Sequence, residues 1–294
     1  YAGIYNGAGA VMSEQYIQIS TTDAELSAIL HPGTAEVGVL IVVGGPQYRV
    51  GSHRQFVKLS RVLAEHTIPS MRLDTSGMGD SSGKKAPFYN QTADISAAID
   101  AFFSANNNIK HIVLWGLCDA ASAILIKLNQ HDPRIAGVVL LNPWVRQQQS
   151  HAQTMLKHYY LKRLFSKAFW RKLLGGGLAI GNSVKGLWQT VQQSKQNTKA
   201  AASAPTVTEQ NYVAAMLSGW QSFNGQVQVI TSGNDLTAEE FLLLCNSEPA
   251  WQHCLKRADH ISIAGASHTF SSAKWRQEVE TACVSFVERI IARQ

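Results

Sequence analysis

The segment Gly116-Leu117-Cys118-Asp119-Ala120 places a cysteine between a predicted buried strand, 111–115, and a predicted helix that begins near residue 120. It matches the G-x-S-x-G pattern of a nucleophile elbow, with Cys for Ser and Ala for the second Gly. The flanking residues of an elbow must be small, because larger side chains would collide with the strand or the helix. Gly116 and Ala120 meet this requirement. A lone cysteine is also often a small buried side chain, so the rest of the chain has to decide.

The composition is that of a globular protein. The 294 residues are 45% hydrophobic and 16% charged, enough for one large core or for one core with an inserted subdomain. The chain contains no run of 18 apolar residues and no signal-peptide pattern, so we expect a cytoplasmic protein. Residues 1–11 have the composition of a flexible or artificial N-terminal extension and are left out of the fold prediction.

The cysteines predict neither a metal site nor a disulfide framework. They lack C-x-x-C spacing and a partnering histidine cluster; they are Cys118, Cys245, Cys254 and Cys283. We therefore expect no metal and no cofactor. A reducing compartment, in which a catalytic thiol survives, fits this pattern.

Alternating strands and helices predict an α/β fold. The strand candidates are apolar without alternation, which is typical of parallel strands covered on both faces. They lie at 37–43, 68–73, 112–115, 135–141, 227–231 and 260–263, and helical spacing occurs at 56–66, 93–104 and 120–128. This organisation predicts a mostly parallel sheet with helices on both faces. The core would comprise 12–145 and 221–294, with a helical insert or lid at 146–220.

Two further residues complete a catalytic triad in the chain order nucleophile, acid, histidine. Asp235 follows the predicted strand 227–231, and His268 follows the predicted strand 260–263. Both would lie at the carboxyl edge of the sheet, where open α/β sheets place their sites. The imidazole would take the proton of the Cys118 thiol, and the carboxylate would orient the imidazole. Each residue also has a common structural role, as a turn residue or a helix cap, but their joint order favours catalysis.

The oxyanion hole is predicted from two backbone amides. One is the N–H of Asp119, the residue after the nucleophile, and the other comes from the loop after the first main strand. In that loop Gly45 is the better donor, with Gln47 in reserve, because Pro46 has no N–H.

Three side chains are candidate substrate contacts. The loop after the first main strand is called the oxyanion loop below. His53 and Arg54 follow it and could favour an anionic substrate, although surface or helix-capping roles are the alternative. Trp144 follows the predicted strand 135–141 and is the third candidate.

Longer strings resemble one family. They are residues 42–56 (VVGGPQYRVGSHRQF), 115–123 (WGLCDAASA), 140–146 (LLNPWVR), 232–241 (SGNDLTAEEF) and the SHTFS around His268. The chain resembles the type 1 α/β hydrolases found with the exosortase A systems of Gram-negative bacteria. The resemblance implies the α/β-hydrolase fold and a setting of exopolysaccharide production and protein sorting at the envelope. The loop 74–81 resembles the D-x-R-G-x-G-x-S loop of α/β hydrolases, with Ser76 where Arg is usual.

The leading functional prediction is an esterase or thioesterase that forms an acyl-thioester on Cys118. An acyltransferase would pass the same acyl group to an alcohol or amine. The alternative from a different functional class is a non-catalytic binding protein with this fold. Loss of a triad member would favour that alternative. All three triad members are present.

The net charge of +6 is concentrated in the predicted insert, since no Asp or Glu occurs between Arg134 and Thr208. Residues 155–174 interleave basic and hydrophobic side chains, as in a lid helix with a solvated basic face. A helix lying on an anionic membrane shows the same pattern, so weak peripheral contact at the inner membrane is the alternative. Nucleic acid is not expected as a partner, because no nucleic-acid-binding fold accompanies the charge.

Overall fold

The computed structural model describes residues 14–146 and 206–293. Their centre is an eight-stranded sheet in the order β1-β2-β4-β3-β5-β6-β7-β8. The strands are β1 Gln15–Ser20, β2 Glu25–His31, β3 Val37–Val42, β4 Ser70–Leu73, β5 His111–Leu117, β6 Ile135–Leu141, β7 Gln226–Ser232 and β8 Asp259–Ile263. The pairs from β4 to β8 are parallel, whereas β1 with β2 and β2 with β4 are antiparallel.

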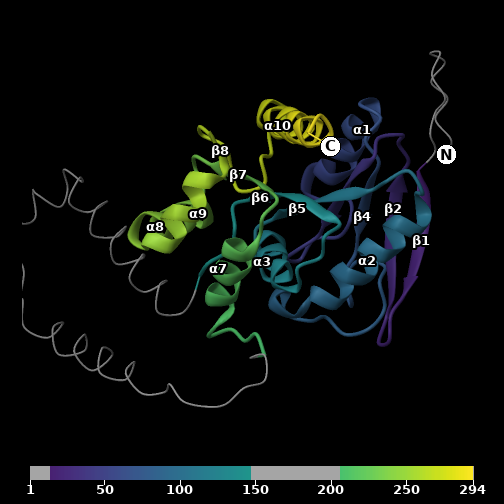
Figure 1. The fold of residues 1–294 in the computed structure, drawn as a ribbon, viewed down its shortest axis with the longest axis horizontal. Coiled ribbons are helices and arrows are strands. Elements are labelled where there is room, and N and C mark those ends of the chain that lie inside the picture. Colours follow the sequence, from purple (N-terminus) through teal and green to yellow (C-terminus); the bar gives the residue numbers. More distant parts are fainter. Residues whose placement is uncertain (1–13, 147–205, 294) are drawn as a thin grey trace, which may run out of the picture. The chain divides into compact units, whose positions relative to one another are not determined.

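Helices cover both faces of this sheet (Figure 1). They are α1 Gln55–Glu65, α2 Thr92–Ala105, α3 Asp119–Lys127, α7 Tyr212–Ser222, α8 Leu236–Ser247, α9 Pro249–Arg257 and α10 Ala273–Ile291, with short 3-10 turns at Ser52–Arg54, Phe88–Asn90 and Leu128–Gln130. The buried residues of α1 and α10 pack on one face, and those of α2, α3 and α7 pack on the other.

Strand β3 shows why this sheet is covered on both sides. All six of its residues are buried. Val39 and Ile41 pack with α1 and α10, whereas Leu40 and Val42 pack with α2 and α3. Because successive side chains of a strand point to opposite faces, a continuously apolar strand needs a helix layer on each side. The predicted mostly parallel sheet with helices on both faces is confirmed.

The sequence prediction missed β1 and β2. Along β1 only Ile19 is fully buried and the polar residues face outward, so the strand lacks the continuous apolar run by which the other strands were found. Strand β2 pairs antiparallel with both neighbours, which places this hairpin at the edge of the parallel sheet.

The chain divides into two compact units, one of residues 1–145 with 207–294 and one of 146–206. The sheet-bearing unit therefore resumes at Val207, whereas the predicted insert extended to residue 220. Helix α7 buries Tyr212, Met216 and Trp220 in the core. The predicted basic segment 155–174 lies outside the described residues. Among the described helices, none has the length and apolarity that a membrane crossing requires.

A buried histidine links the stability of this fold to pH. His31 is 3% exposed, and its Nε2 accepts a hydrogen bond from Arg72 Nε at 3.3 Å. Burial, reinforced by the positive charge of Arg72, lowers the pKa of His31 to about 4. Between that value and the pKa of about 6.5 for an unfolded histidine, the unfolded chain binds more protons than the folded one.

We therefore expect the free energy of unfolding to fall by about 2 kcal/mol as the pH is lowered from about 6.5 to 4 because of this residue. His31→Gln, which keeps an acceptor for Arg72, should flatten this part of the pH profile measured by urea denaturation. His253→Gln is the matched control, since that side chain is exposed. An unchanged slope in His31→Gln would contradict the prediction.

Candidate active site

Cys118 stands on a sharp turn between β5 and α3. Its backbone has φ 62° and ψ −122°, a conformation that residues other than glycine rarely adopt. A Cβ at Gly116 would lie 2.7 Å from Ile124 Cδ1 and 2.8 Å from the carbonyl carbon of Ala120. Gly116 is therefore required by the close approach of α3 to β5. The predicted strand, turn and helix are all present.

Backbone hydrogen bonds fix this turn in place. The N–H of Cys118 donates to the carbonyl of Leu141, the last residue of β6, at 2.8 Å. The Cys118 carbonyl accepts from Ser122 N–H and from Trp144 N–H, each at 3.3 Å. The half-buried Trp144, a predicted substrate contact, thus has its backbone beside Cys118. The side chain of Cys118 is itself only partly buried.

Asp235 and His268 form the predicted acid–histidine pair. His268 Nδ1 lies 2.8 Å from Asp235 Oδ2. Because an ionised carboxylate can only accept, Nδ1 carries the proton and Nε2 is left as the acceptor. Asp235 also caps α8, accepting from Ala238 N–H at 3.1 Å and from Thr237 N–H at 3.4 Å. The acid is thereby held rigidly, while the imidazole remains one-third exposed.

The loops that carry these two residues lie side by side. Gly233 N–H donates to the Ile263 carbonyl at 2.9 Å, and Asn234 N–H donates to the Ala266 carbonyl at 3.0 Å. A Cβ at Gly233 would lie 2.7 Å from the nitrogen of Gly265, so the approach requires glycine. These bonds extend the pairing of β7 with β8 beyond the strand ends.

Asn142 was not predicted to have a role, yet it joins three parts of the site. It is fully buried with φ 43°. Its Nδ2 donates to Ser232 Oγ at 2.7 Å and to the His268 carbonyl at 3.1 Å, and its Oδ1 accepts from Ser232 N–H at 2.8 Å. Since the preceding Leu141 accepts from the N–H of Cys118, two consecutive residues link Cys118 to the loop that carries His268. The sequence feature that could have identified Asn142 is its position as a polar residue directly after a buried strand.

Two of the predicted oxyanion donors, Gly45 and Gln47, already have an acceptor. Gly45, with φ 64°, donates its N–H to Asp119 Oδ2 at 2.8 Å. Gln47, the reserve donor, gives its N–H to the Gly44 carbonyl at 3.4 Å. The carboxylate of Asp119 therefore occupies the neighbourhood that the sequence prediction assigned to backbone amides.

His53 and Arg54 lie directly before α1, in a 3-10 turn where both have positive φ. Both side chains are exposed. Their contact with a substrate stays a prediction.

Arg49 anchors the oxyanion loop to the loop 74–81. Arg49 forms ion pairs with the fully buried Asp74 and with the exposed Asp80. Ser76, where the family pattern has Arg, donates through its N–H and its hydroxyl to Asp94 at 2.7 and 2.9 Å.

The other three cysteines have a different environment. Cys245, Cys254 and Cys283 are buried. Burial raises the pKa of Cys245 and of Cys283 to about 12 and raises that of Cys254 as well. These thiols are therefore poor nucleophiles at neutral pH.

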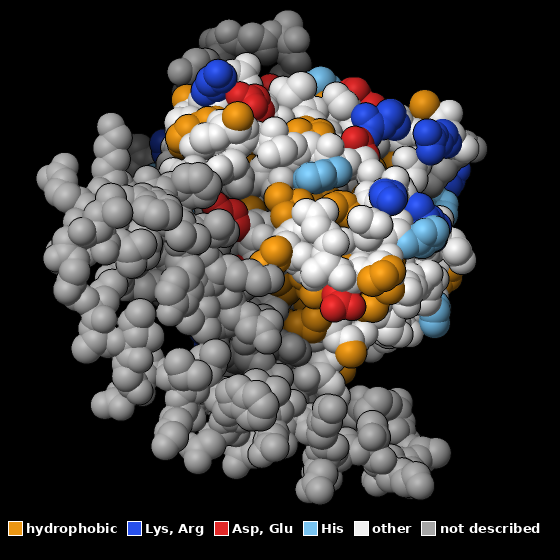
Figure 2. All heavy atoms as spheres, turned by 90° about the vertical axis from the view of Figure 1, so that its left-hand side faces the viewer, with side chains coloured by type: hydrophobic (Ala, Val, Ile, Leu, Met, Phe, Trp, Pro, Cys, Tyr) orange, Lys and Arg blue, Asp and Glu red, His pale blue; other side chains and the backbone are white. Residues whose placement is uncertain are grey.

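One face of the described core mixes apolar and charged side chains. Figure 2 shows hydrophobic side chains exposed around a histidine near the middle of this face, with most of the Lys and Arg side chains to one side. Such a surface can contact both apolar and polar parts of a ligand.

A family comparison agrees with this geometry. The family model described as serine aminopeptidase, S33, matches residues 38–245, which include β3, the elbow and the acid. The chain belongs to the serine aminopeptidase S33 family. It is therefore an α/β-fold hydrolase. The family description names a serine, whereas this S33 member has Cys118 at the elbow between β5 and α3.

Solved structures share the fold of this S33 member. An esterase of Pyrococcus furiosus is 14% identical, with a TM-score of 0.63, over 99% of this chain and 98% of that one. Est1E of Butyrivibrio proteoclasticus, solved with ferulic acid bound, is 14% identical, with a TM-score of 0.59, over 94% and 99%. DcsB, solved with a substrate analogue, is 13% identical, with a TM-score of 0.61, over 95% and 100%. No match was found among curated proteins.

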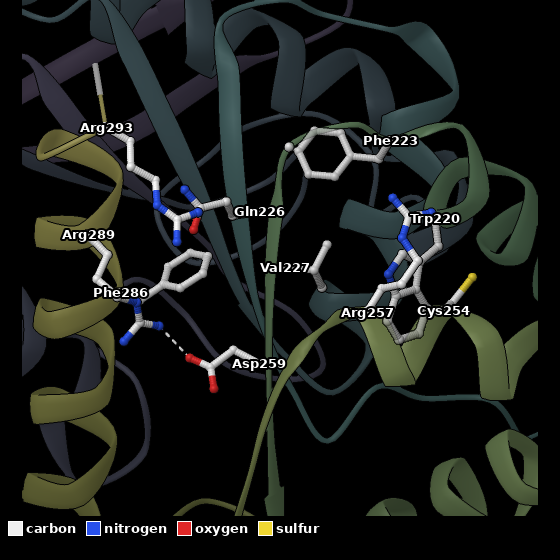
Figure 3. A pocket seen from close by; sticks show the side chains of 11 residues that line it. Trp220, Phe223, Gln226, Val227, Cys254, Arg257, Asp259, Phe286, Arg289 and Arg293 are labelled. Atoms are coloured by element: carbon white, nitrogen blue, oxygen red, sulfur yellow. Dashed lines mark hydrogen bonds and ion pairs between the residues drawn. The ribbon is translucent and has the colours of Figure 1, made fainter.

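A cavity of about 460 Å³ in this S33 member lies away from the triad (Figure 3). Gln226 and Asp259, the first residues of β7 and β8, line it, whereas the triad follows the last residues of the strands. Its arginines, Arg257, Arg289 and Arg293, lie at the C-terminal ends of α9 and α10, where positive charge offsets the helix dipole.

Within residues 14–146 and 206–293, no three His, Cys, Asp or Glu side chains are grouped as a metal site.

Proposed function

We propose that this chain is an acyl hydrolase, an esterase or thioesterase, that uses Cys118, His268 and Asp235. The observation that carries the proposal is the 2.8 Å bond between His268 Nδ1 and Asp235 Oδ2, at the sheet edge where Cys118 occupies an elbow with φ 62°. The bond leaves Nε2 of the imidazole as the base. The N-terminus of α3, which begins directly after Cys118, favours the thiolate.

The proposed reaction has two halves. In the first, His268 takes the proton of Cys118, and the thiolate attacks the acyl carbonyl carbon. The tetrahedral intermediate then expels an alcohol or thiol, which leaves with the proton from His268. In the second, His268 takes a proton from water, which attacks the thioester and releases the acid and the Cys118 thiol. Asp235 keeps the imidazole in one tautomer throughout.

The substrate class follows from two supporting observations. The solved structures of the same fold include an esterase. The resemblance of residues 42–56 and 115–123 to the hydrolases of exosortase A systems extends the proposal to acyl groups handled in exopolysaccharide production. Disruption of the gene in a host that secretes such a polymer should then alter the acyl content of the polymer.

Iodoacetamide at near-neutral pH is expected to alkylate Cys118 before the other cysteines, and turnover of p-nitrophenyl acetate should fall in proportion. The reason is that burial raises the pKa values of Cys245, Cys254 and Cys283, whereas a thiol paired with an imidazole reacts as the thiolate. Peptide mapping by mass spectrometry, with activity measured at each time point, makes the comparison.

Cys118→Ala is the control, and it should have neither early labelling nor turnover. Full activity in a sample whose Cys118 is completely alkylated would exclude the proposed nucleophile. Earlier labelling of a different cysteine would count against it as well.

A further inference from the structure

The side chain of Asp119 lies among the amides predicted to form the oxyanion hole. Its Oδ2 accepts from Gly45 N–H at 2.8 Å. Gly45 and Asp119 are the two residues whose N–H groups the fold is expected to offer to a substrate oxyanion. In this structure a carboxylate of the protein accepts from the first of these groups, the N–H of Gly45.

The site fits this carboxylate closely. A Cβ at Gly44 would lie 2.0 Å from Asp119 Oδ1 and 2.7 Å from Ala120 N, so only glycine is accommodated there. Oδ1 is buried and has no hydrogen-bond partner. Burial raises the pKa of Asp119, although hydrogen bonds from backbone N–H groups and the charge of Lys85 oppose the shift. Keeping the Asp119 carboxylate ionised in this buried position therefore costs free energy. Movement of the carboxylate into solvent would recover that free energy.

An acidic residue in the first turn of α3 has a simpler explanation, since it interacts favourably with the helix dipole. That role does not require contact with Gly45, which lies 74 positions earlier in the loop after β3. A negatively charged oxygen that accepts from these amides instead resembles the oxyanion of a tetrahedral intermediate.

We propose that the Asp119 carboxylate is a resident occupant of the oxyanion hole, which a substrate carbonyl oxygen displaces, so that Asp119 slows acylation of Cys118. This inference rests on the proposed function. When the Cys118 thiolate attacks, a C–S bond forms and the carbonyl π pair moves to oxygen. That oxygen needs the N–H groups of Gly45 and Asp119, and it competes with the Asp119 carboxylate for the N–H of Gly45. Collapse restores the carbonyl and expels the leaving group, which takes its proton from His268.

Comparing the acylation rate of Cys118 Sγ with its alkylation rate distinguishes a role of Asp119 in the oxyanion hole from an effect of Asp119 on thiol activation. Acylation by p-nitrophenyl acetate passes through an oxyanion. Alkylation by iodoacetamide displaces iodide at a saturated carbon and forms none. Removal of a nearby negative charge favours the thiolate and raises both rates, so the ratio of the two rates reports on the oxyanion hole.

Asp119→Ala is expected to raise the ratio of the acylation rate to the alkylation rate about tenfold or more. Asp119→Asn should give an intermediate ratio, because its amide oxygen still accepts from Gly45 N–H without the charge. Both rates are measured on intact protein by mass spectrometry in single-turnover experiments. Thermal melting establishes that each variant is folded, and Asp119→Asn carries the test if Asp119→Ala is not.

A ratio that is unchanged or lower in the folded variants would overturn the inference and make Asp119 a support for the oxyanion loop. Wild-type acylation would in that case leave the proposed function standing. If neither the wild type nor a variant is acylated at Cys118 while all are alkylated normally, the proposed function fails, and the inference fails with it.

Discussion

His268→Ala is expected to lower kcat/KM for p-nitrophenyl acetate by about 10⁴-fold, because the variant loses the base that activates Cys118 and the acid that protonates the leaving group. Asp235→Asn should lower it by about 10²-fold or more. Its amide oxygen can still cap α8 at Thr237 and Ala238, but its NH₂ group cannot accept from His268 Nδ1. Initial rates of the purified variants at a fixed pH measure both losses.

The double variant His268→Ala/Asp235→Asn tests whether the two residues act together. The acid works only through the imidazole, so the double variant should lie within about threefold of His268→Ala alone. Losses that multiply would show that the residues do not share one mechanism. His66→Ala is the matched control, since His66 is exposed after the end of α1, and it should keep the wild-type rate.

The parts of the fold that could be predicted are those with a strong local signal. Strands β3, β5 and β6 are short, mostly apolar segments. The burial of every residue of β3 explains why its sequence does not alternate. The elbow could be predicted because sterics at Cys118 restrict positions 116 and 120 to small residues. The pairing of Asp235 with His268 could be predicted because parallel strands place the loops that follow them at the same edge of the sheet.

The parts that could not be predicted depend on contacts between distant residues. Strand β1 has one buried residue, Ile19, and its apolar positions alternate with polar ones, so a search for continuous apolar runs does not find it. Asn142 is tied to Ser232 and to His268, 90 and 126 positions away, and no spacing rule anticipates such bonds. Asp119 was expected to contribute its N–H alone, because its contact with Gly45 depends on how the loop after β3 lies against α3.

Asp74→Ala is expected to lower the free energy of unfolding by about 3–5 kcal/mol, because it leaves the Arg49 guanidinium without its buried partner. Asp74 is fully buried, and the side chain of Arg49 is 14% exposed. Asp74 also accepts from the backbone N–H of Arg49, and from Asp80 N–H at 3.1 Å, so two further donors lose their acceptor. Urea denaturation measures the loss.

Asp80→Ala is the matched control, because Asp80 pairs with the same arginine but its side chain is 68% exposed. That change should cost about 0–1 kcal/mol, as exposed ion pairs do. Equal losses in the two variants would contradict the assignment of Asp74 as the anchor of the loop. Since Arg49 and Gly45 belong to the same loop after β3, Asp74→Ala should also slow acylation of Cys118 more than alkylation. Asp74 would then serve catalysis by fixing the position of the Gly45 N–H, in addition to stabilising the fold.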